Sequence, residues 1–412
     1  MQTGIAHRVG DRIELPGLAT AHSHAFQRAL RGRTERKATK ANNFWSWRGL
    51  MYGLANALDP ETLYDISHFA FVELAMSGVT AVGEFHYVQH QPGGQPYDDR
   101  TLLAETVVRA ARDAGLRIVL LRVGYQRAGA GKAALAEQMR FCDASADAVL
   151  KDALEVRKRF RNDPLVSVGL APHSVRAVPR SWIEDLSRAA KHEKMPFSMH
   201  VAEQRLEIEE CLHEYGKRPV HLLADDGVID ERFVAVHATH LMPDEAKILG
   251  HARAFACLCR TTERDLGDGV SVAGALVVEG ARLCTGIDSY SITDPFEEAR
   301  SIELDARIHR EARHVAADAP ALMEAMSKNG YAALGLSGLE TRDKVTLDAN
   351  DASLAGADEA LLDDAVIFGA TPRAIREVSV EGRTIVENGL HIGYDKARIG
   401  YERSLKKILA AL

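Results

Sequence analysis

The sequence is poor in cysteine and has no long apolar run, and each shortage excludes a class of protein. Only five of the 412 residues are cysteines, and their odd number and wide spacing argue against a disulfide framework. No apolar run approaches the roughly 20 residues that span a bilayer, and residues 1–11 lack the apolar core of a signal peptide. We therefore expect a cytoplasmic protein that has no membrane partner.

The chain also lacks a concentration of positive charge. It has 51 lysines and arginines against 58 aspartates and glutamates, a net charge of −7, and no basic block that would bind a row of phosphates, so we expect no nucleic-acid partner. It contains no Walker loop, no dinucleotide fingerprint and no G-x-S-x-G elbow. An anionic small molecule remains compatible with this charge, because a few well-placed arginines are enough to bind one.

What the sequence does contain is a regular alternation of strand-like and helix-like segments. Eight apolar stretches rich in β-forming residues alternate with helical patterns: the run that leads to His24, then 79–87, 116–123, 166–171, 196–200, 233–237, 254–259 and 282–286. Near-continuous apolar strands are typical of a parallel sheet buried on both faces, and a barrel needs about 250 residues. We predict an α/β fold, a (β/α)8 barrel of the TIM type.

The pattern changes after about residue 338. Short strand-like runs follow at 344–348, 365–369 and 375–380, and the last turns at 381–383 into 384–386. We predict a small β-sandwich-like appendage built mainly from the C-terminal segment. The predicted organisation is residues 1–16 as a short N-terminal part of the appendage, 17–337 as the barrel, and 338–412 as the appendage with a terminal helix. The polar, basic segment 28–43 is expected to be a loop.

Histidines and a carboxylate gather where the predicted strands end. His22 and His24 are two residues apart, so a strand points both side chains the same way; His200 ends the fifth strand and Asp288 follows the eighth. Barrel enzymes place their chemistry at the carboxyl ends of the strands, and nitrogen and oxygen ligands suit a catalytic zinc. We predict that these four residues bind one metal ion. Incidental histidines are the alternative, and iron, nickel or manganese would also suit the site.

Two further ionisable groups follow strand ends. Glu203 lies three residues after His200 and could move protons between an activated water and a substrate. His237 ends the sixth strand and could hydrogen-bond the attacking water or stabilise developing charge. Because Glu203 is not needed as a ligand, its presence favours a hydrolase over a zinc-containing barrel that serves only in binding or assembly.

These motifs resemble one enzyme superfamily. The H-x-H, the later histidine, the H-x-x-E and the terminal aspartate are similar to the single-metal deaminase branch of the amidohydrolases. More narrowly, five segments resemble the formimidoylglutamate deiminases of histidine degradation: Pro-Gly-Leu-x-x-x-His-Ser-His-Ala-Phe-Gln-Arg, Phe-Trp-Ser-Trp-Arg, Ala-Pro-His-Ser-Val-Arg-Ala-Val, His-Val-Ala-Glu-Gln and Val-His-Ala-Thr-His-Leu. The resemblance covers most of residues 15–335.

The resemblance implies an enzyme with one Zn²⁺ per subunit that hydrolyses N-formimino-L-glutamate to N-formyl-L-glutamate and ammonia. It implies that Asp288 takes a proton from the water, that Glu203 passes it to the departing ammonia, and that His237 assists at the reacting centre. The matching substrate contacts are Gln27, Arg48, Tyr87, His173 and Arg176. The resemblance also implies a homodimer.

The residues alone leave alternatives at some of these positions. Two fixed cations suit a dicarboxylate substrate, yet Arg48 is also consistent with a surface arginine beside an aromatic cluster, and His173 and Arg176 with capping or surface groups. The chain departs from the family at Tyr290, where many relatives carry histidine, and around Arg260, where proline is commoner. The alternative function is a related deaminase that acts on another amidine, a guanidine or a purine-like ring.

Overall fold

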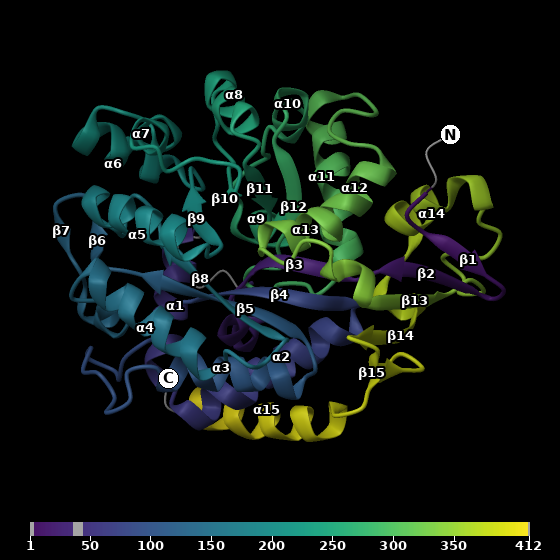
Figure 1. The fold of residues 1–412 in the computed structure, drawn as a ribbon, viewed down its shortest axis with the longest axis horizontal. Helices are drawn as coiled ribbons and strands as arrows, with labels where there is room; N and C mark the ends of the chain where they lie inside the picture. Colours follow the sequence, from purple (N-terminus) through teal and green to yellow (C-terminus); the bar gives the residue numbers. More distant parts are fainter. Residues whose placement is uncertain (1–3, 36–43, 411–412) are drawn as a thin grey trace.

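The computed structural model describes residues 4–35 and 44–410. Within these ranges the chain forms a barrel with helices around it and a separate antiparallel sheet at one side (Figure 1). The segment 28–43, expected to be a loop, is described only as far as residue 35; it opens inside a short 3₁₀ helix, Ala25–Leu30, and its remainder lies outside the described residues.

Eight parallel strands form the barrel, which confirms the predicted fold class. Along the sheet they are β12 (Arg282–Thr285), β11 (Phe255–Leu258), β10 (Phe233–His237), β9 (Phe197–Val201), β8 (Val166–Pro172), β5 (Arg117–Gly124), β4 (Val79–His86) and β3 (Leu18–Ser23). The ends of this sheet meet where Ser23 pairs with Asp288 and where the amide of Ile287 donates to the carbonyl of His22 at 3.0 Å. The sheet is therefore nearly closed.

The strands are mostly apolar because helices cover the outside of the barrel while side chains fill its inside. Every residue of β3, β4 and β5 is buried, as expected for a parallel sheet with both faces covered. The covering helices are α1 (Phe44–Ala57), α2 (Pro60–Met76), α3 (Leu102–Asp113), α4 (Ala146–Arg159), α5 (Arg180–Glu193), α6 (Arg205–Tyr215), α7 (Pro219–Asp225), α8 (Pro243–His251), α9 (Arg260–Leu266), α10 (Ala273–Glu279), α11 (Pro295–Arg310), α12 (Ala319–Met326) and α13 (Lys328–Ala333).

Local signals explain where several helices begin and end. Asp59 accepts a hydrogen bond from the amide of Thr62 at 2.8 Å, and Pro60 occupies the first turn of α2, so a capping side chain and a proline mark the start of this helix. Residues 205–225 form two helices rather than one continuous helix. Gly216 ends α6 with φ of +68°, and Pro219 begins α7.

The second sheet joins the two ends of the chain. Its order is β1 (His7–Val9), β2 (Arg12–Pro16), β13 (Lys344–Asp348), β14 (Ile375–Val380), β15 (Arg383–Glu387) and β16 (Leu390–His391), all antiparallel. In this sheet Leu15 stands opposite Val345. A short antiparallel hairpin of β6 (Arg127–Gly129) and β7 (Lys132–Ala133) is separate from both sheets. The predicted domain boundaries at 16 and 337 stay a prediction.

One predicted strand of the appendage is wrong. Residues 365–369 belong to a helix, α14 (Leu362–Gly369). A short apolar run does not distinguish a strand from a buried helix, and here Asp363 and Asp364 stand in the first turn, where carboxylates stabilise a helix. Asp363 also accepts a hydrogen bond from the amide of Ala6 at 2.8 Å, so the helix holds the start of the chain.

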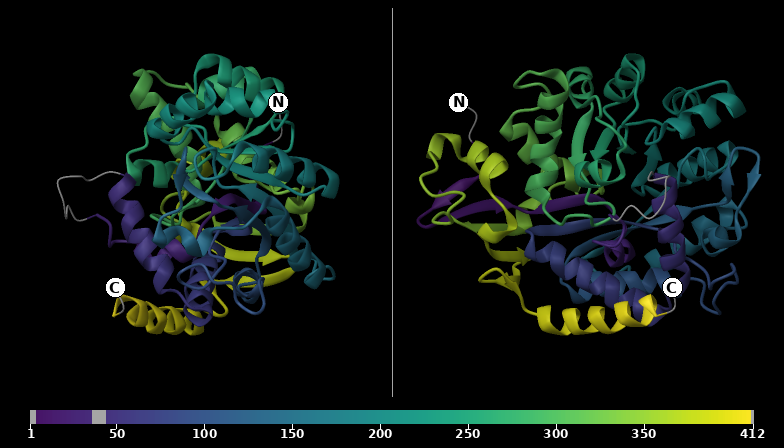
Figure 2. Two further views of the ribbon diagram at one scale, coloured as in Figure 1. Left: turned by 90° about the vertical axis from the view of Figure 1, so that its left-hand side faces the viewer. Right: turned by 180° about the vertical axis from the view of Figure 1, so that it is seen from behind.

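The chain ends in α15 (Tyr394–Leu409), which runs along the outside of α2 (Figures 1 and 2). The rings of Phe69 and Tyr401 stack with centroids 4.7 Å apart, and the hydroxyl of Ser404 donates to Asp65 at 2.6 Å. Among the described residues, no helix is both long and apolar enough to cross a membrane.

Candidate active site

Four of the predicted residues meet at the carboxyl ends of the barrel strands. His22 is in β3 and His24 follows it, His200 is in β9, and Asp288 follows β12. The Nε2 atom of His22 lies 3.2 Å from Nε2 of His24 and 3.1 Å from Nε2 of His200. The carboxylate oxygen Oδ1 of Asp288 lies 3.6 Å from Nε2 of His22 and 3.3 Å from Nε2 of His24. Residues far apart in the sequence thus gather around His22 in two overlapping groups, one of His22, His24 and Asp288 and the other of His22, His200 and His237.

The hydrogen bonds of two of these rings orient their lone pairs toward that point. Nδ1 of His24 lies 2.9 Å from the carbonyl oxygen of Phe85, and Nδ1 of His200 lies 3.1 Å from that of His173. A carbonyl only accepts, so we assign the protons to Nδ1 and the lone pairs to Nε2. Both lone pairs face Nε2 of His22, at 3.2 and 3.1 Å, and a shared cation would satisfy all three nitrogens, so this arrangement suits a metal ion.

The ligand atoms around His22 are spaced as neighbouring metal ligands are. Zinc binds imidazole nitrogen at about 2.0–2.1 Å, which sets the separation of neighbouring ligand atoms in a tetrahedron at about 3.3 Å. The ligand atoms of His24, His200 and Asp288 lie 3.1 to 3.6 Å from Nε2 of His22, and those of His24 and Asp288 lie 3.3 Å apart. The cluster is therefore a buried group of histidines and an aspartate of the kind that binds a metal.

Burial sets the protonation states that metal binding needs. It lowers the pKa of His24 to about 3, and it also lowers the pKa values of His22 and His200, so the rings are neutral at pH 7, the form that coordinates metals. Burial alone would raise the pKa of Asp288, but its hydrogen bond to His22 and the neighbouring imidazoles hold that pKa below its usual range. Asp288 is consequently ionised.

The backbone is strained at the residues of this site. Asp288, His237 and Ala202 have φ values of +52°, +68° and +51°, in the left-handed region that residues other than glycine rarely adopt. Each costs of order 1–3 kcal/mol and persists only where the surrounding structure imposes it. Such strain is concentrated at functional sites, and here it falls on three residues that lie in or beside the cluster.

His237 and Glu203 stand next to the cluster. Nε2 of His237 lies 3.6 Å from Oδ2 of Asp288 and 3.9 Å from Oε1 of Glu203. Burial opposes a charge on His237, but the carboxylates of Glu203, Glu263 and Asp288 raise its pKa to about 10. Burial, together with the charge of Asp288, raises the pKa of Glu203. A proton donor and a carboxylate that readily holds a proton therefore face the same space.

That space is a narrow chamber of about 50 Å³. The side chains that line it include all five of the predicted substrate contacts, Gln27, Arg48, Tyr87, His173 and Arg176, together with His24, His200, Glu203, His237 and Asp288. His22 lies beneath, fully buried. The structure thus brings together every residue that the sequence singled out for this site.

Positive charge lines the chamber at Arg48 and Arg176. The guanidinium of Arg48, in α1, lies 5.5 Å from the ring centroid of Tyr52. Burial lowers the pKa of Arg48, and the nearby charge of Arg176 adds to that effect against the opposing influence of Tyr52. Arg176 is itself 9% exposed and donates to the carbonyl of Ala128 at 3.1 Å. Two cations that line one buried chamber indicate a site for anionic groups.

Polar groups on the chamber wall are joined to each other. The amide of Gln27 donates to the Tyr87 hydroxyl at 2.8 Å, and its oxygen Oε1 is buried with no hydrogen-bond partner among the described residues. Nδ1 of His173 lies 3.1 Å from the hydroxyl of Ser174. An orphaned buried acceptor beside two arginines indicates that a polar ligand completes the wall.

Two tyrosines of the chamber were missed by the sequence reasoning. Gln138 donates to the hydroxyls of Tyr52 and Tyr125 at 2.9 and 2.6 Å, and both tyrosines line the chamber. Tyr125 directly follows β5, so its place at a strand end was a usable signal. Tyr52 lies on α1, and nothing in its spacing indicates which face of that helix the chamber takes.

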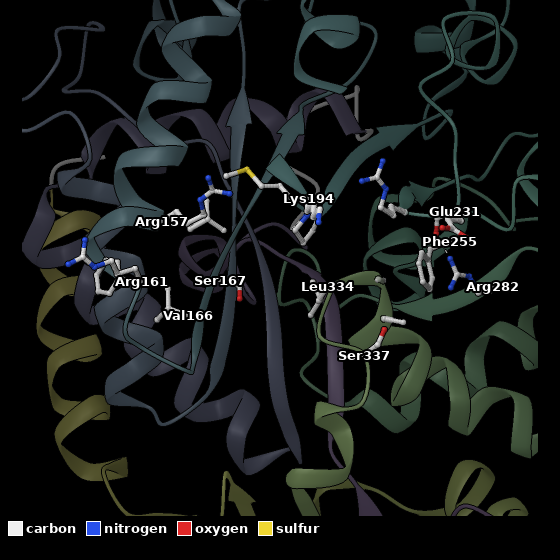
Figure 3. Close-up of a pocket in the computed structure, with 18 residues that line it drawn as sticks. Arg157, Arg161, Val166, Ser167, Lys194, Glu231, Phe255, Arg282, Leu334 and Ser337 are labelled. Carbon is white, nitrogen blue, oxygen red and sulfur yellow. Dashed lines mark hydrogen bonds between the residues drawn. The ribbon is translucent and has the colours of Figure 1, made fainter. Parts of the chain in front are cut away.

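A larger hollow of about 770 Å³ lies at the opposite end of the barrel (Figure 3). It is bordered by the first residues of β8, β11 and β12, and it contains none of the predicted site residues. Its arginines are largely engaged: Arg157 pairs with Glu193, and Arg282 donates to the carbonyl of Arg253 at 2.9 Å. The amino-terminal face of such barrels serves stability rather than chemistry, so we place the active site in the smaller chamber.

Comparison with known proteins gives the same picture. Residues 13–341 match the Amidohydrolase family. The chain is 36% identical to a formimidoylglutamate deiminase of Pseudomonas aeruginosa over 98% of this chain and 91% of that protein. It is 23% identical to a 5-methylthioadenosine/S-adenosylhomocysteine deaminase of Thermodesulfovibrio yellowstonii over 92% of this chain and 81% of that protein.

Solved structures agree with the fold. The crystal structure of an amidohydrolase from Brucella melitensis superposes with a TM-score of 0.90 at 33% identity, covering 96% of this chain and 90% of that one. An adenosine deaminase from Xanthomonas campestris with bound zinc gives a TM-score of 0.81 at 22% identity, covering 97% and 87%. The second similarity is one of fold alone.

Proposed function

Because the chain belongs to the amidohydrolase family and is formimidoylglutamate deiminase-like over nearly its full length, we propose that it hydrolyses N-formimino-L-glutamate to N-formyl-L-glutamate and ammonia. The observation that carries this proposal is the pairing of a buried metal-type cluster with two arginines in one chamber. The cluster supplies hydrolytic chemistry, and the arginines match a substrate with two carboxylates.

We propose that His22, His24, His200 and Asp288 hold one Zn²⁺ per subunit. The neutral rings, the direction of their Nε2 lone pairs and the separation of the ligand atoms support this assignment. When bound, zinc supplies a nucleophile at neutral pH by lowering the pKa of a coordinated water toward 7.

The proposed reaction moves both protons of the water across the chamber. Water oxygen adds to the formimino carbon, Asp288 takes the first proton of the water, and Glu203 passes a proton to the imino nitrogen. The hydroxyl of the adduct then loses its proton to Asp288 as the carbon–nitrogen bond breaks, and a second proton delivered through Glu203 completes the ammonia that leaves. Glu203 suits this role because it lines the chamber and burial raises its pKa. His237 directs Nε2 toward the reacting centre and stabilises the charge that develops there.

The remaining residues bind and orient the substrate. We propose that Arg48 and Arg176 pair with its two carboxylates, since charge-assisted hydrogen bonds from guanidinium are strong and directional. Gln27, Tyr87 and His173 complete the wall. Burial and the charge of Arg176 lower the pKa of His173 well below its usual value, so the ring is neutral and adds no third cation.

A second candidate is deamination of a purine nucleoside, as the name of the more distant relative suggests. The two cations that line the chamber favour a dianion over a neutral ring. We therefore place formiminoglutamate first.

Ammonia release by the zinc-loaded protein tests the proposal, with formiminoglutamate compared against formiminoaspartate, guanine and N-carbamoyl-L-glutamate. Formiminoaspartate is one methylene shorter than formiminoglutamate. We therefore expect kcat/KM for formiminoglutamate to be about 10- to 200-fold higher than kcat/KM for formiminoaspartate. Faster turnover of guanine, or no turnover of formiminoglutamate, would overturn the proposal.

A further inference from the structure

A second buried carboxylate lies behind His237. Oε1 of Glu263, in α9, lies 3.2 Å from Nδ1 of His237 and accepts a hydrogen bond from the amide of Cys259 at 2.9 Å. The Glu263 side chain is 0% exposed and that of His237 is 1% exposed. The contact occupies the ring nitrogen that points away from the chamber, so Nε2 is the nitrogen that faces Asp288 and Glu203.

Glu263 is itself held by a buried arginine. Nη1 of Arg260 pairs with the second carboxylate oxygen of Glu263, and Arg260 donates through Nε and Nη2 to Asp305 at 3.0 and 2.7 Å. Arg264 donates to the same aspartate at 2.6 Å. The contacts form a continuous chain from His237 through Glu263 and Arg260 to Asp305, on α11.

Stability alone does not account for this chain. Withdrawing two full charges from water costs several kcal/mol per ion, and apolar residues of similar volume commonly serve as well or better. The chain ends on an imidazole that lines the chamber, and the backbone of that residue is in the left-handed region. A costly buried network that terminates on a reacting group indicates a role in orienting that group.

We infer that Glu263 is a positioning residue: by accepting the Nδ1 proton of His237 it fixes the orientation in which Nε2 faces the reacting carbon, and Arg260, held by Asp305, keeps Glu263 in place. This inference deepens the proposed function and rests on it for the identity of the reaction. The arrangement follows the logic by which a buried carboxylate holds a catalytic histidine in hydrolases of other folds.

Glu263→Gln tests the inference because glutamine keeps the shape but offers one acceptor oxygen in place of two. The side-chain NH2 of the glutamine then faces either Arg260 or His237, and that residue loses its hydrogen-bond acceptor. We expect kcat to fall by about 100-fold or more, with KM changed less than about threefold and with the zinc content unchanged. A Glu263→Gln enzyme whose kcat lies within threefold of the parent value would overturn the inference.

Glu298→Gln is the matched control. Glu298 is also fully buried and accepts a hydrogen bond from the amide of Thr261 on the same helix α9 at 3.1 Å, but it does not contact His237. We expect its kcat to stay within about threefold of the parent. An equal loss in both variants would mean that the effect is packing of α9, and the inference would fail.

A spectroscopic measurement separates this inference from the proposed function. In enzyme labelled with ¹⁵N-histidine, the buried Nδ1 proton of His237 gives a downfield signal, identified by its absence in His237→Ala. We expect it in the parent and in Glu298→Gln, and expect it lost or shifted in Glu263→Gln. An unchanged signal contradicts the inference; the expected signals in an enzyme that leaves formiminoglutamate intact would contradict only the proposed function.

Discussion

At the scale of single residues, the surroundings assign opposite tasks to side chains of the same type. Burial lowers the pKa of His24 to about 3, whereas neighbouring carboxylates raise that of His237 to about 10 despite its burial. The first imidazole offers a lone pair at pH 7 and the second offers a proton. Groups whose environments push their pKa values apart in this way are typical of acid and base assignments in active sites.

Glu203→Gln is expected to abolish proton delivery while leaving the metal in place, since glutamine is nearly isosteric and Glu203 is not needed as a ligand. We expect ammonia release to fall by about 10²- to 10⁴-fold, with the metal content per subunit unchanged by elemental analysis. A variant as active as the parent would refute the proton-transfer role.

Arg48→Met tests recognition of the substrate charge. Loss of one charge-assisted contact of about 1.5–3 kcal/mol predicts a fall in kcat/KM of about 10- to 100-fold for formiminoglutamate. Arg188→Met, on the exposed face of α5 and far from the chamber lining, serves as the control. A neutral purine-like substrate would be turned over equally well by the parent and the Arg48 variant, which would favour the alternative function.

At the scale of elements, parallel strands explain why much of the site was predictable. The carboxyl ends of strands in one barrel converge, so His22 in β3 and His200 in β9 were expected to meet despite their separation in sequence. Tyr52 and Glu263 lie on helices, and which helix face meets the chamber depends on packing that spacing does not encode. Residues 365–369 were predicted as a strand but belong to α14, because a short apolar run is compatible with either a strand or a buried helix.

One contact between α9 and α11 makes the free energy of unfolding depend on pH. Burial raises the pKa of Glu298 to about 8 against the opposing effect of its hydrogen bonds with Thr261. An unfolded glutamate titrates near 4.3, so the native state holds a proton that the unfolded state releases between these values. This contribution to stability is full below about pH 4.3 and is lost as pH rises toward 8.

Glu298→Gln should therefore flatten the pH dependence of unfolding. We expect the free energy of unfolding of the parent, relative to the variant, to decline between about pH 5 and 8 by as much as about 1.4 kcal/mol per pH unit. Urea titrations of both proteins at several pH values measure the difference. Parallel curves for the two proteins would show that Glu298 does not titrate in this range.

At the scale of the whole molecule, the C-terminal helix ties the end of the chain to the barrel. Tyr401 is 7% exposed, stacks on Phe69 in α2, and accepts a hydrogen bond from Nη1 of Arg28 at 3.1 Å. Arg28 lies in the 3₁₀ helix that follows His24, a proposed metal ligand. Helix α15 thus contacts, through Arg28, the 3₁₀ helix that follows the proposed ligands His22 and His24.

Tyr401→Ala is expected to destabilise the protein by about 2–4 kcal/mol, because it removes a large buried ring and a hydrogen bond. Ile399→Ala on the same helix is the control, since Ile399 is 58% exposed and its loss should change stability by less than about 0.5 kcal/mol. Equal unfolding midpoints in urea for both variants would contradict the packing described for α15.

The homodimer implied by the family resemblance stays a prediction. Sedimentation velocity of the 45.1 kDa chain distinguishes a monomer from a species of twice that mass. A monomeric active enzyme would correct the expectation without affecting the site, because every residue assigned to it lies in one chain.

The central claim is that three histidines and one aspartate from the ends of three strands hold a single metal ion that makes hydrolysis possible. An anomalous difference map recorded at the zinc edge, on crystals of protein that releases ammonia from formiminoglutamate, tests it most directly. We predict one peak within about 2.0–2.3 Å of Nε2 of His22, His24 and His200 and of the Asp288 carboxylate. A fully active crystal with no peak among these four residues, or with its peak elsewhere, would contradict the account.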